Sequence, residues 1–195
     1  MIMTSKFDKV IVAGTFDRLH DGHLQLINTA AGLGSRVFCG LTTEQMNKQK
    51  VLHQTIQNYQ QREAGLKNYL KWIGADKKAR ITPINDIYGP TLKDADIDAI
   101  VTTSDSVKNV DKINTLRIGK NFKPVKKIIA DLIPAEDRKN LSSTRIRLGQ
   151  INRHGCVFDL LFKNKNLALP AGQRLHFKKP LGSLIKIDSQ NTSFD

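Results

Sequence analysis

The chain has 195 residues, a length typical of one domain or of one domain with a short extension. With 39% hydrophobic and 25% charged residues, its composition is that of a globular protein and excludes disordered and collagen-like chains. Its 31 lysines and arginines outnumber its 18 aspartates and glutamates, which gives a formal net charge of +13. Such a charge favours an anionic partner, but nucleotides, nucleic acids and anionic lipids all meet that description.

The sequence contains no sign of a membrane span, a secretory signal or a metal-binding cysteine pattern. No apolar run approaches the roughly 18 residues that a membrane span needs. Residues 1–9 mix both signs of charge and do not resemble a secretory signal. Cys39 and Cys156 lie far apart and show no metal-binding spacing. We therefore predict a cytoplasmic protein with free thiols and no membrane partner.

The first half of the chain alternates between predicted strands and helices. A short apolar run at Lys9–Ala13, ended by Gly14, predicts a buried strand. From Gly22 to Ala31, apolar residues at three- and four-residue spacing predict a helix, which Gly32 or Gly34 ends in a left-handed conformation. There follow a predicted strand at Arg36–Leu41, a loop at Thr43–Gln54, and a helix from Tyr59 to Ile73 that Gly74 ends.

The same alternation continues to about Ile151. The predicted elements are strands at Ala79–Ile84 and Ala99–Thr102, a helix at Lys108–Ile118, a strand at Val125–Ile133, and a helix from Ser142 to Leu148. The pattern predicts an α/β fold with a doubly wound parallel sheet, whose ligand crevice lies beyond the carboxyl ends of the strands. Residues 1–151 are expected to form this domain and residues 152–195 a carboxyl-terminal extension.

The strongest chemical signal is the segment 14–23 (GTFDRLHDGH), between the first strand and the first helix. Gly14 permits a tight turn, Thr15 and Phe16 offer donors, and Gly22 leaves the backbone bare. A helix N-terminus attracts anions, and His20 and His23 are spaced to face one phosphate there. A surface histidine pair or half of a metal site would be alternatives. GxGxxG and GxxxxGK[ST] motifs are absent.

The segment 141–147 (LSSTRIR) is the second signal. Ser142 can cap a helix, because its hydroxyl accepts from free backbone N–H groups. An ordinary cap with a basic first turn is the alternative interpretation. Arginines are unfavourable near the positive end of a helix unless an anion offsets them, so Arg145 and Arg147 point to a phosphate.

These motifs carry a family resemblance. GTFDRLHDGH resembles the GTFDxxHxGH signature of the nucleotidyltransferase superfamily, and SSTRIR resembles the helix opening that holds the β- and γ-phosphates of ATP there. Between them lie Gly89-Pro90-Thr91, the acidic stretch ending at Asp105, and residues 131–137 (DLIPAED). This order is similar to that of the archaeal and eukaryotic type of phosphopantetheine adenylyltransferase. The resemblance implies a Rossmann-like nucleotidyltransferase fold and adenylyl transfer from Mg-ATP to 4′-phosphopantetheine, giving dephospho-coenzyme A and pyrophosphate.

The resemblance also assigns roles to residues. It makes His23 the catalytic donor to the α-phosphate, places His20 at the leaving phosphates, and gives Lys48 or Lys50, with Thr15, to the acceptor phosphate. Lys50 is the favoured lysine and is counted as catalytic. The implied nucleotide-binding residues are Gly14, Thr15, Phe16, Asp17, Gly22, His23, Asn114, Arg117, Ser142, Ser143, Thr144 and Arg145. Mg²⁺ is expected to enter with ATP, without a protein metal cage.

Two places depart from the family pattern. Residues 106–110 lack an expected glycine, and Gln60-Gln61-Arg62 replaces a more acidic run. Leu167–Ile187 resembles the opening of the archaeal GTP-dependent dephospho-coenzyme A kinase. A truncated fusion, a remnant of a following kinase domain and a chance match are the alternatives for this extension, and no kinase activity is expected from it.

Two other functions remain open at this stage. One is another nucleotidyltransferase of the superfamily, either similar to FAD synthetase or a cytidylyltransferase. The other is a basic nucleic-acid-binding module, which the 6% aromatic content and the lack of known nucleic-acid motifs disfavour.

Overall fold

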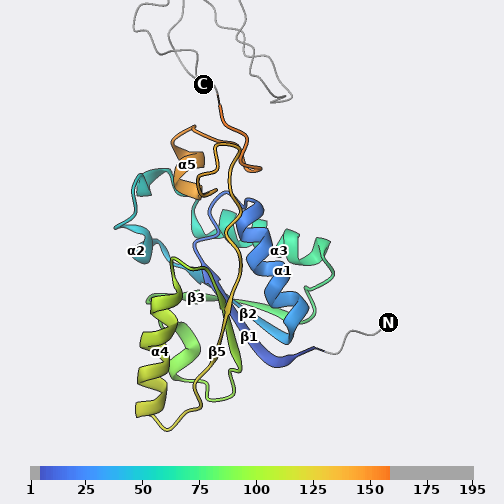
Figure 1. Ribbon diagram of the computed structural model, residues 1–195, viewed down its shortest axis with the longest axis vertical. Coiled ribbons are helices and arrows are strands. Elements are labelled where there is room, and N and C mark those ends of the chain that lie inside the picture. Colours follow the sequence, from blue (N-terminus) through green and yellow to red (C-terminus); the bar gives the residue numbers. More distant parts are fainter. Residues whose placement is uncertain (1–4, 159–195) are drawn as a thin grey trace, which may run out of the picture.

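The computed structural model describes residues 5–158, whose strands form a single parallel sheet (Figure 1). The strands are β1 (Phe7–Gly14), β2 (Gly34–Thr42), β3 (Ala79–Ile84), β4 (Ala99–Thr102) and β5 (Lys126–Ile129). Their order is β3-β2-β1-β4-β5, and every neighbouring pair is parallel. This confirms the predicted α/β fold with a doubly wound parallel sheet.

Helices cover both faces of the sheet. They are α1 (Asp21–Leu33), α2 (Glu44–Asn47), α3 (Tyr59–Trp72), α4 (Val107–Gly119) and α5 (Ser143–Arg147), with short 3₁₀ helices η1 (His53–Thr55) and η2 (Gly89–Leu92). Helices α1 and α3 pack on one face, and α4 packs with η2 on the other (Figure 1). Helix α5 lies beyond the carboxyl ends of the strands.

The buried side chains of β1 alternate between the two faces. Val10 and Val12 belong to the cluster that includes Ile27 of α1 and Leu66 of α3, whereas Ile11 packs with α4. This period of two is a property of every strand, and it makes β1 apolar on both sides. Each such buried side chain stabilises the fold by about 1.5–3 kcal/mol. The central strand is therefore a rigid base for the turn that follows Gly14.

Several predicted boundaries agree with the structure, and others were wrong. β3 and β4 match the predictions, α4 extends one residue further at each end, and Gly74 ends α3 with a positive φ of 67°. The predicted left-handed stop of α1 was wrong, because the chain passes straight into β2 at Gly34 with φ −101°. A Cβ at Gly34 would lie 2.9 Å from the Arg36 carbonyl oxygen, so close packing explains this glycine better.

Two segments differ more strongly from the predictions. The strand predicted at Val125–Ile133 is confined to β5, and residues 131–133 instead line a cavity at the end of the sheet. The loop predicted at Thr43–Gln54 contains α2 and the start of η1. Helix α3 begins with a capping box, in which Asn58 and Gln61 each bind the other's backbone N–H, so the Gln61 of the unusual Gln60-Gln61-Arg62 run has a local role.

The extension predicted at residues 152–195 lies mostly outside the described residues, and the segment Leu167–Ile187 lies wholly outside them. Both cysteines are free, and burial raises the pKa of Cys39 to about 12. In the described part of the chain, no helix has the length and apolar character required to cross a bilayer.

Candidate active site

Two cavities open at the carboxyl ends of the strands, on either side of the turn after β1. β1 and β4 are neighbours at which the strand order reverses, and ligand sites of doubly wound sheets lie at such a point. A polar cavity of about 420 Å³ is lined by Thr15, His20, His23 and residues 141–144. An apolar cavity of about 160 Å³ lies against β1 and α4. Ser106 lines both, so the cavities adjoin.

The two histidines of the first motif lie side by side in the polar cavity. His20 is the N-cap of α1, and its ring stacks on that of His23 with the centroids 3.8 Å apart. The Nδ1 atoms of both rings are buried and have no hydrogen-bond partner in the described chain. Buried polar atoms normally have partners, so these two point to a ligand that supplies one.

Both imidazoles are neutral at pH 7. Burial lowers the pKa of His20 to about 4, although the carboxylates of Asp21 and Asp17 act in the opposite direction. Burial, His20 and Lys50 together hold the pKa of His23 well below its usual value. Each ring therefore carries one N–H donor and one acceptor nitrogen, which suits hydrogen bonding to phosphate oxygens without proton transfer.

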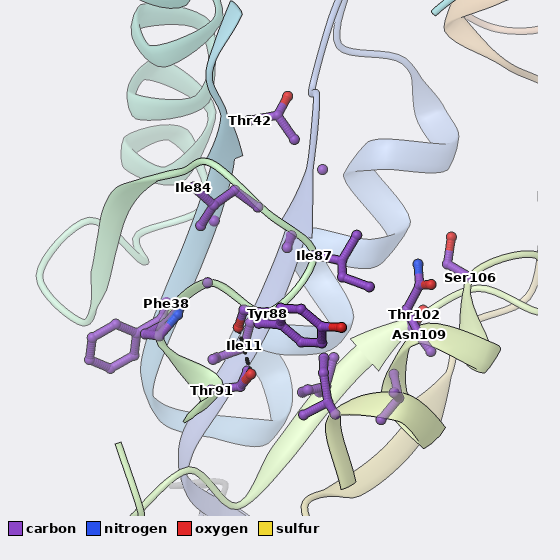
Figure 2. Close-up of a pocket in the computed structure, with 18 of the residues that line it drawn as sticks. Ile11, Phe38, Thr42, Ile84, Ile87, Tyr88, Thr91, Thr102, Ser106 and Asn109 are labelled. Carbon is purple, nitrogen blue, oxygen red and sulfur yellow. Dashed lines mark hydrogen bonds between the residues drawn. The ribbon is translucent and has the colours of Figure 1, made fainter. Parts of the chain in front are cut away.

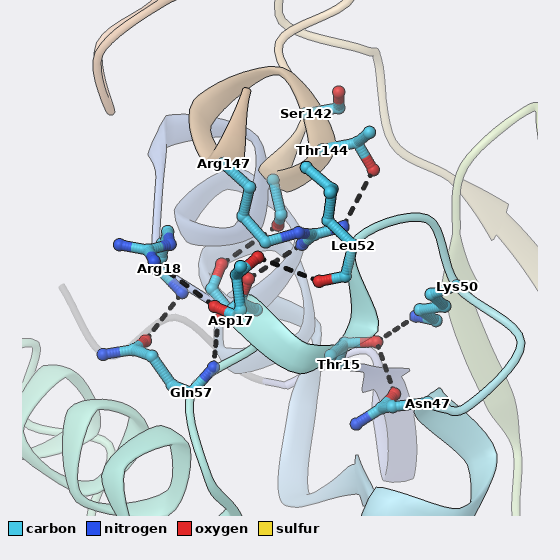
Figure 3. Close-up of polar contacts among 12 residues, drawn as sticks. Thr15, Asp17, Arg18, Asn47, Lys50, Leu52, Gln57, Ser142, Thr144 and Arg147 are labelled. Atoms are coloured by element: carbon cyan, nitrogen blue, oxygen red, sulfur yellow. Dashed lines mark hydrogen bonds and ion pairs between the residues drawn. The ribbon is translucent and has the colours of Figure 1, made fainter. Parts of the chain in front are cut away.

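Thr15 connects the first motif to the segment after β2. Its hydroxyl is 3.4 Å from Asn47 Oδ1, which also accepts from the Thr42 hydroxyl at 2.9 Å. The Lys50 ammonium reaches the same Thr15 hydroxyl and lines the polar cavity (Figure 3). Lys48 is exposed at the end of α2 and is not among the residues that line the cavity. The structure thus brings Lys50 to Thr15.

A buried ion pair joins the first motif to α5 (Figure 3). The Asp17 carboxylate accepts from Arg147 Nη1 at 2.8 Å and from the Gln57 backbone N–H at 3.0 Å. Ser143 Oγ donates to the Asp17 carbonyl oxygen at 3.0 Å, and Arg147 Nη2 donates to the Val51 carbonyl oxygen at 3.1 Å. Arg147 therefore holds three segments together while it lines the polar cavity.

Three residues expected at the nucleotide lie elsewhere. Arg145 pairs with Asp137 at 2.6 Å and does not line the cavity, because α5 turns it to the face opposite Arg147. The fully buried Arg117 donates to carbonyl oxygens of Thr91 and of residues 94, 95, 97 and 123. Asn114 binds both backbone polar groups of Val125. Arg117 and Asn114 therefore connect structural segments, contrary to the expectation.

Gly14, Phe16 and Gly22 shape the cavities. Phe16 is buried with φ 49°, and its ring contacts His23 edge-on at 5.3 Å. Gly14 lines the apolar cavity. A Cβ at Gly22 would lie 3.2 Å from the His20 ring, so the absence of a side chain makes room for this imidazole. Gly22 also lines the polar cavity, and the nucleotide contact predicted for it stays a prediction.

The apolar cavity has a distinct chemistry (Figure 2). Its lining includes Ile11, Phe38, Ile84, Ile87 and Ile113, and it contains no charged side chain among the described residues. The Tyr88 ring extends across it, and Ser106 and Asn109 supply polar groups from the other side (Figure 2). Such a cavity suits an uncharged chain with a few hydrogen-bonding groups.

Comparisons with known proteins identify the family of this chain. Residues 11–149 match the model of the cytidylyltransferase-like family. The phosphopantetheine adenylyltransferase of Methanosarcina mazei is 39% identical over 151 residues, which are 75% of this chain and 95% of that protein. That of Methanopyrus kandleri is 33% identical over 82% of this chain and its own full length. The chain belongs to the phosphopantetheine adenylyltransferases, within the cytidylyltransferase-like family.

The fold of this member of the phosphopantetheine adenylyltransferase family is similar to folds of solved structures. A protein of unknown function from Archaeoglobus fulgidus has a TM-score of 0.58 at 25% identity, covering 69% of this chain and 99% of that one. A bifunctional NMN adenylyltransferase/ADP-ribose pyrophosphatase from Francisella tularensis has a TM-score of 0.51 at 21% identity. The match covers 73% of this chain and 41% of that protein. Because the identity is only 21%, the match supports the fold alone.

For some residues at the site of this family member, the sequence predicted no role. Asn47, Tyr88 and Asn109 come from segments between the two motifs. Asp105 and Asp131 belong to stretches that carry the family resemblance, and they line the polar cavity without a role assigned from the sequence. Each is a common residue type in a loop or helix, without a local pattern. Only their position after the carboxyl end of a strand could have indicated them.

Proposed function

We propose that the protein transfers the adenylyl group of ATP to 4′-phosphopantetheine, giving dephospho-coenzyme A and pyrophosphate. The observation that carries the proposal is the junction of two unlike cavities at the turn after Gly14. The polar cavity, with His20, His23, Lys50 and Arg147, suits a polyphosphate. The uncharged cavity suits the pantetheine arm, whose amide groups can bind Tyr88 and Asn109. The match to the cytidylyltransferase-like family and the similarity to the phosphopantetheine adenylyltransferase of Methanosarcina mazei support the same reaction.

The acceptor phosphate lies, in this proposal, at Thr15 and Lys50. An oxygen of this phosphate attacks the α-phosphorus of ATP, and the bond from that phosphorus to the bridging oxygen of the β-phosphate breaks. Pyrophosphate leaves with the electron pair, so no covalent intermediate with the protein forms. Because both reactants are anions, the main contribution of the protein is to hold them in line.

Transition-state charge is spread by donors that face the polar cavity. We assign His23 to the α-phosphate oxygen and His20, Arg147 and the hydroxyls of residues 142–144 to the leaving phosphates. Neutral imidazoles donate one N–H each, and a buried donor stabilises developing charge more strongly than it would in water. The assignment of Arg147 replaces that of Arg145, which binds Asp137.

Mg²⁺ fits this cavity as a partner of the phosphates. Within the described residues, no cluster of three or more His, Cys, Asp or Glu side chains could hold a metal ion alone. Asp105 and Asp131 line the polar cavity, and Mg²⁺ commonly binds one or two carboxylates while keeping several waters. Bound there, the ion would neutralise charge on the phosphates. The cytoplasmic location expected from the sequence stays a prediction.

The test is an assay of the full chain with ATP, Mg²⁺ and 4′-phosphopantetheine. We expect pyrophosphate and dephospho-coenzyme A in equal amounts, identified by mass. Parallel reactions with FMN, a phosphoalcohol and CTP address the alternative nucleotidyltransferases. Turnover of one of those acceptors without turnover of 4′-phosphopantetheine would contradict the proposal. Sequence-dependent nucleic-acid binding with a steep salt dependence, and no turnover, would indicate the binding module instead.

A further inference from the structure

Arg62 of α3 is a buried cation that the proposed reaction does not use. Its side chain has 0% exposure, and it contacts the turn after Gly14 at the Thr15 carbonyl oxygen. Nη1 donates to the carbonyl oxygens of Thr15 at 3.0 Å and of Thr42 at 2.8 Å, and Nε donates to that of Gln57 at 2.8 Å. One guanidinium thus binds the ends of β1 and β2 and the start of α3.

These contacts begin where the pairing of β1 with β2 ends. The last register pair is Gly14 with Leu41, and the Thr15 and Thr42 carbonyls that follow are bridged by Arg62. The hydroxyls of the same two threonines both bind Asn47, and Lys50 follows three residues later. Arg62 therefore sets how far Thr15 lies from the segment that carries Lys50.

The charge of Arg62 is only weakly offset. Its Nη2 atom is buried without a hydrogen-bond partner in the described chain, and the nearest carboxylate, on Glu44, is 3.8 Å away and largely exposed. The carboxylate of Asp17 also acts on Arg62, but it is paired with Arg147. A purely structural clamp would be expected to have its buried donors satisfied. Here an under-neutralised positive charge contacts the Thr15 carbonyl without lining the polar cavity, and it favours an anion near Thr15.

We propose that Arg62 is a positioning residue for the acceptor phosphate. It fixes Thr15 and Lys50 relative to each other through its carbonyl contacts, and its charge supports anion binding near Thr15. This inference rests on the proposed function for the identity of the acceptor, but its geometry does not depend on ATP.

The pKa of Lys50 provides a measure of how strongly the positive charge of Arg62 acts at the site. Burial lowers this pKa most, and Arg147 and Arg62 lower it further, whereas Asp17 raises it. Lys50 in turn lowers the pKa of His23, on α1. Removing the positive charge of Arg62 should therefore raise the pKa of Lys50, because fewer cations then oppose its protonation.

The experiment compares Arg62→Met and Arg62→Lys in the full chain. NMR of labelled lysine measures the pKa of Lys50 without substrates, and calorimetry measures the affinity for inorganic phosphate. Arg62→Met should raise the pKa and weaken phosphate binding about tenfold or more. Arg62→Lys keeps the charge but loses the planar fork, so it should weaken phosphate binding with little change in the pKa.

A matched control is Lys78→Met. Lys78 also bridges two backbone carbonyls, those of Ala31 and Gly34, but at the amino end of β2. It should lower the melting temperature without changing the pKa of Lys50 or phosphate binding. If Arg62→Met does not fold, the phosphate affinity of Arg62→Lys still tests whether Arg62 positions the acceptor phosphate.

Kinetics then separate this inference from the proposed function. In an active enzyme, both Arg62 variants should raise KM for 4′-phosphopantetheine more than KM for ATP. Wild-type phosphate affinity in Arg62→Lys, or equal changes in both KM values, would overturn the inference while turnover by the unaltered chain stands. Conversely, an inactive chain whose Arg62 variants lose phosphate binding would overturn only the proposed function.

Discussion

The His20–His23 pair shows how burial prepares single residues for phosphate chemistry. Their rings stack within 3.8 Å, which two imidazolium ions would oppose, and burial keeps both neutral. Each can then donate one hydrogen bond without competing with a charged neighbour. Burial at the N-terminus of α1 thus keeps both imidazoles neutral and allows their rings to stack.

His23→Ala should lower kcat by about 100-fold or more, because it removes a preorganised donor at the transition state. KM for ATP should change much less. Steady-state pyrophosphate release provides the measurement. His154→Ala is the control, since this exposed imidazole pairs with Asp21 outside the polar cavity. A near-normal rate in His23→Ala would contradict the assigned role.

The same burial makes stability depend on pH. The pKa of His20 is about 4 in the folded protein and about 6.5 when unfolded, so the unfolded state binds more protons between these values. The free energy of unfolding should thus fall as the pH drops from about 6.5 to 4, by up to about 3 kcal/mol from His20 alone. Urea midpoints measured across this range test the prediction, and His20→Gln should flatten the dependence. An equally steep slope in that variant would assign it to other groups.

At the scale of elements, α5 shows how one short helix separates two arginines. Arg145 and Arg147 are two residues apart, so they lie on different faces. Arg145 binds Asp137 at the periphery, while Arg147 is 3% exposed and binds Asp17 in the site. The Asp17 pair also links α5 to the turn after β1, which makes the position of this helix depend on the first motif.

Arg147→Lys should raise KM for ATP about tenfold or more, because a single ammonium cannot bind Asp17, the Val51 carbonyl and a phosphate together. Arg145→Lys should change KM for ATP less than about threefold, since a peripheral ion pair contributes little. Initial rates over a range of ATP concentrations give both values. The opposite ranking would restore Arg145 as the phosphate ligand.

At the scale of the whole molecule, two adjoining cavities of unlike chemistry lie at the carboxyl ends of the sheet. The net charge of +13 is spread over the chain, and the cavity on the α4 side contains no charged lining residue in the described part. Lys50 and Arg147 instead line the polar cavity. Most of the positive charge thus has no role in the proposed site.

An acceptor analogue that ends in a carboxylate should therefore be a poor substrate. Burying an unpaired charge in an uncharged cavity is costly, and we expect kcat/KM to fall about 100-fold or more relative to 4′-phosphopantetheine. An analogue of equal length with a neutral end serves as the control. Equal rates for the two analogues would show that the arm end stays in water and does not enter this cavity.

The sequence by itself determined the alternation of elements and the two motifs, because strand and helix periodicity, glycine turns and hydroxyl caps are local properties of a chain. It therefore predicted β3, β4 and α4 closely, together with the position of the site at the carboxyl ends of the strands. Only the tertiary structure decided that Lys50 reaches Thr15, that Arg147 faces the polar cavity, and that Arg117 and Asn114 do not. Those choices depend on which side chains from distant segments meet, and the spacing of residues along a loop or a short helix does not contain that information.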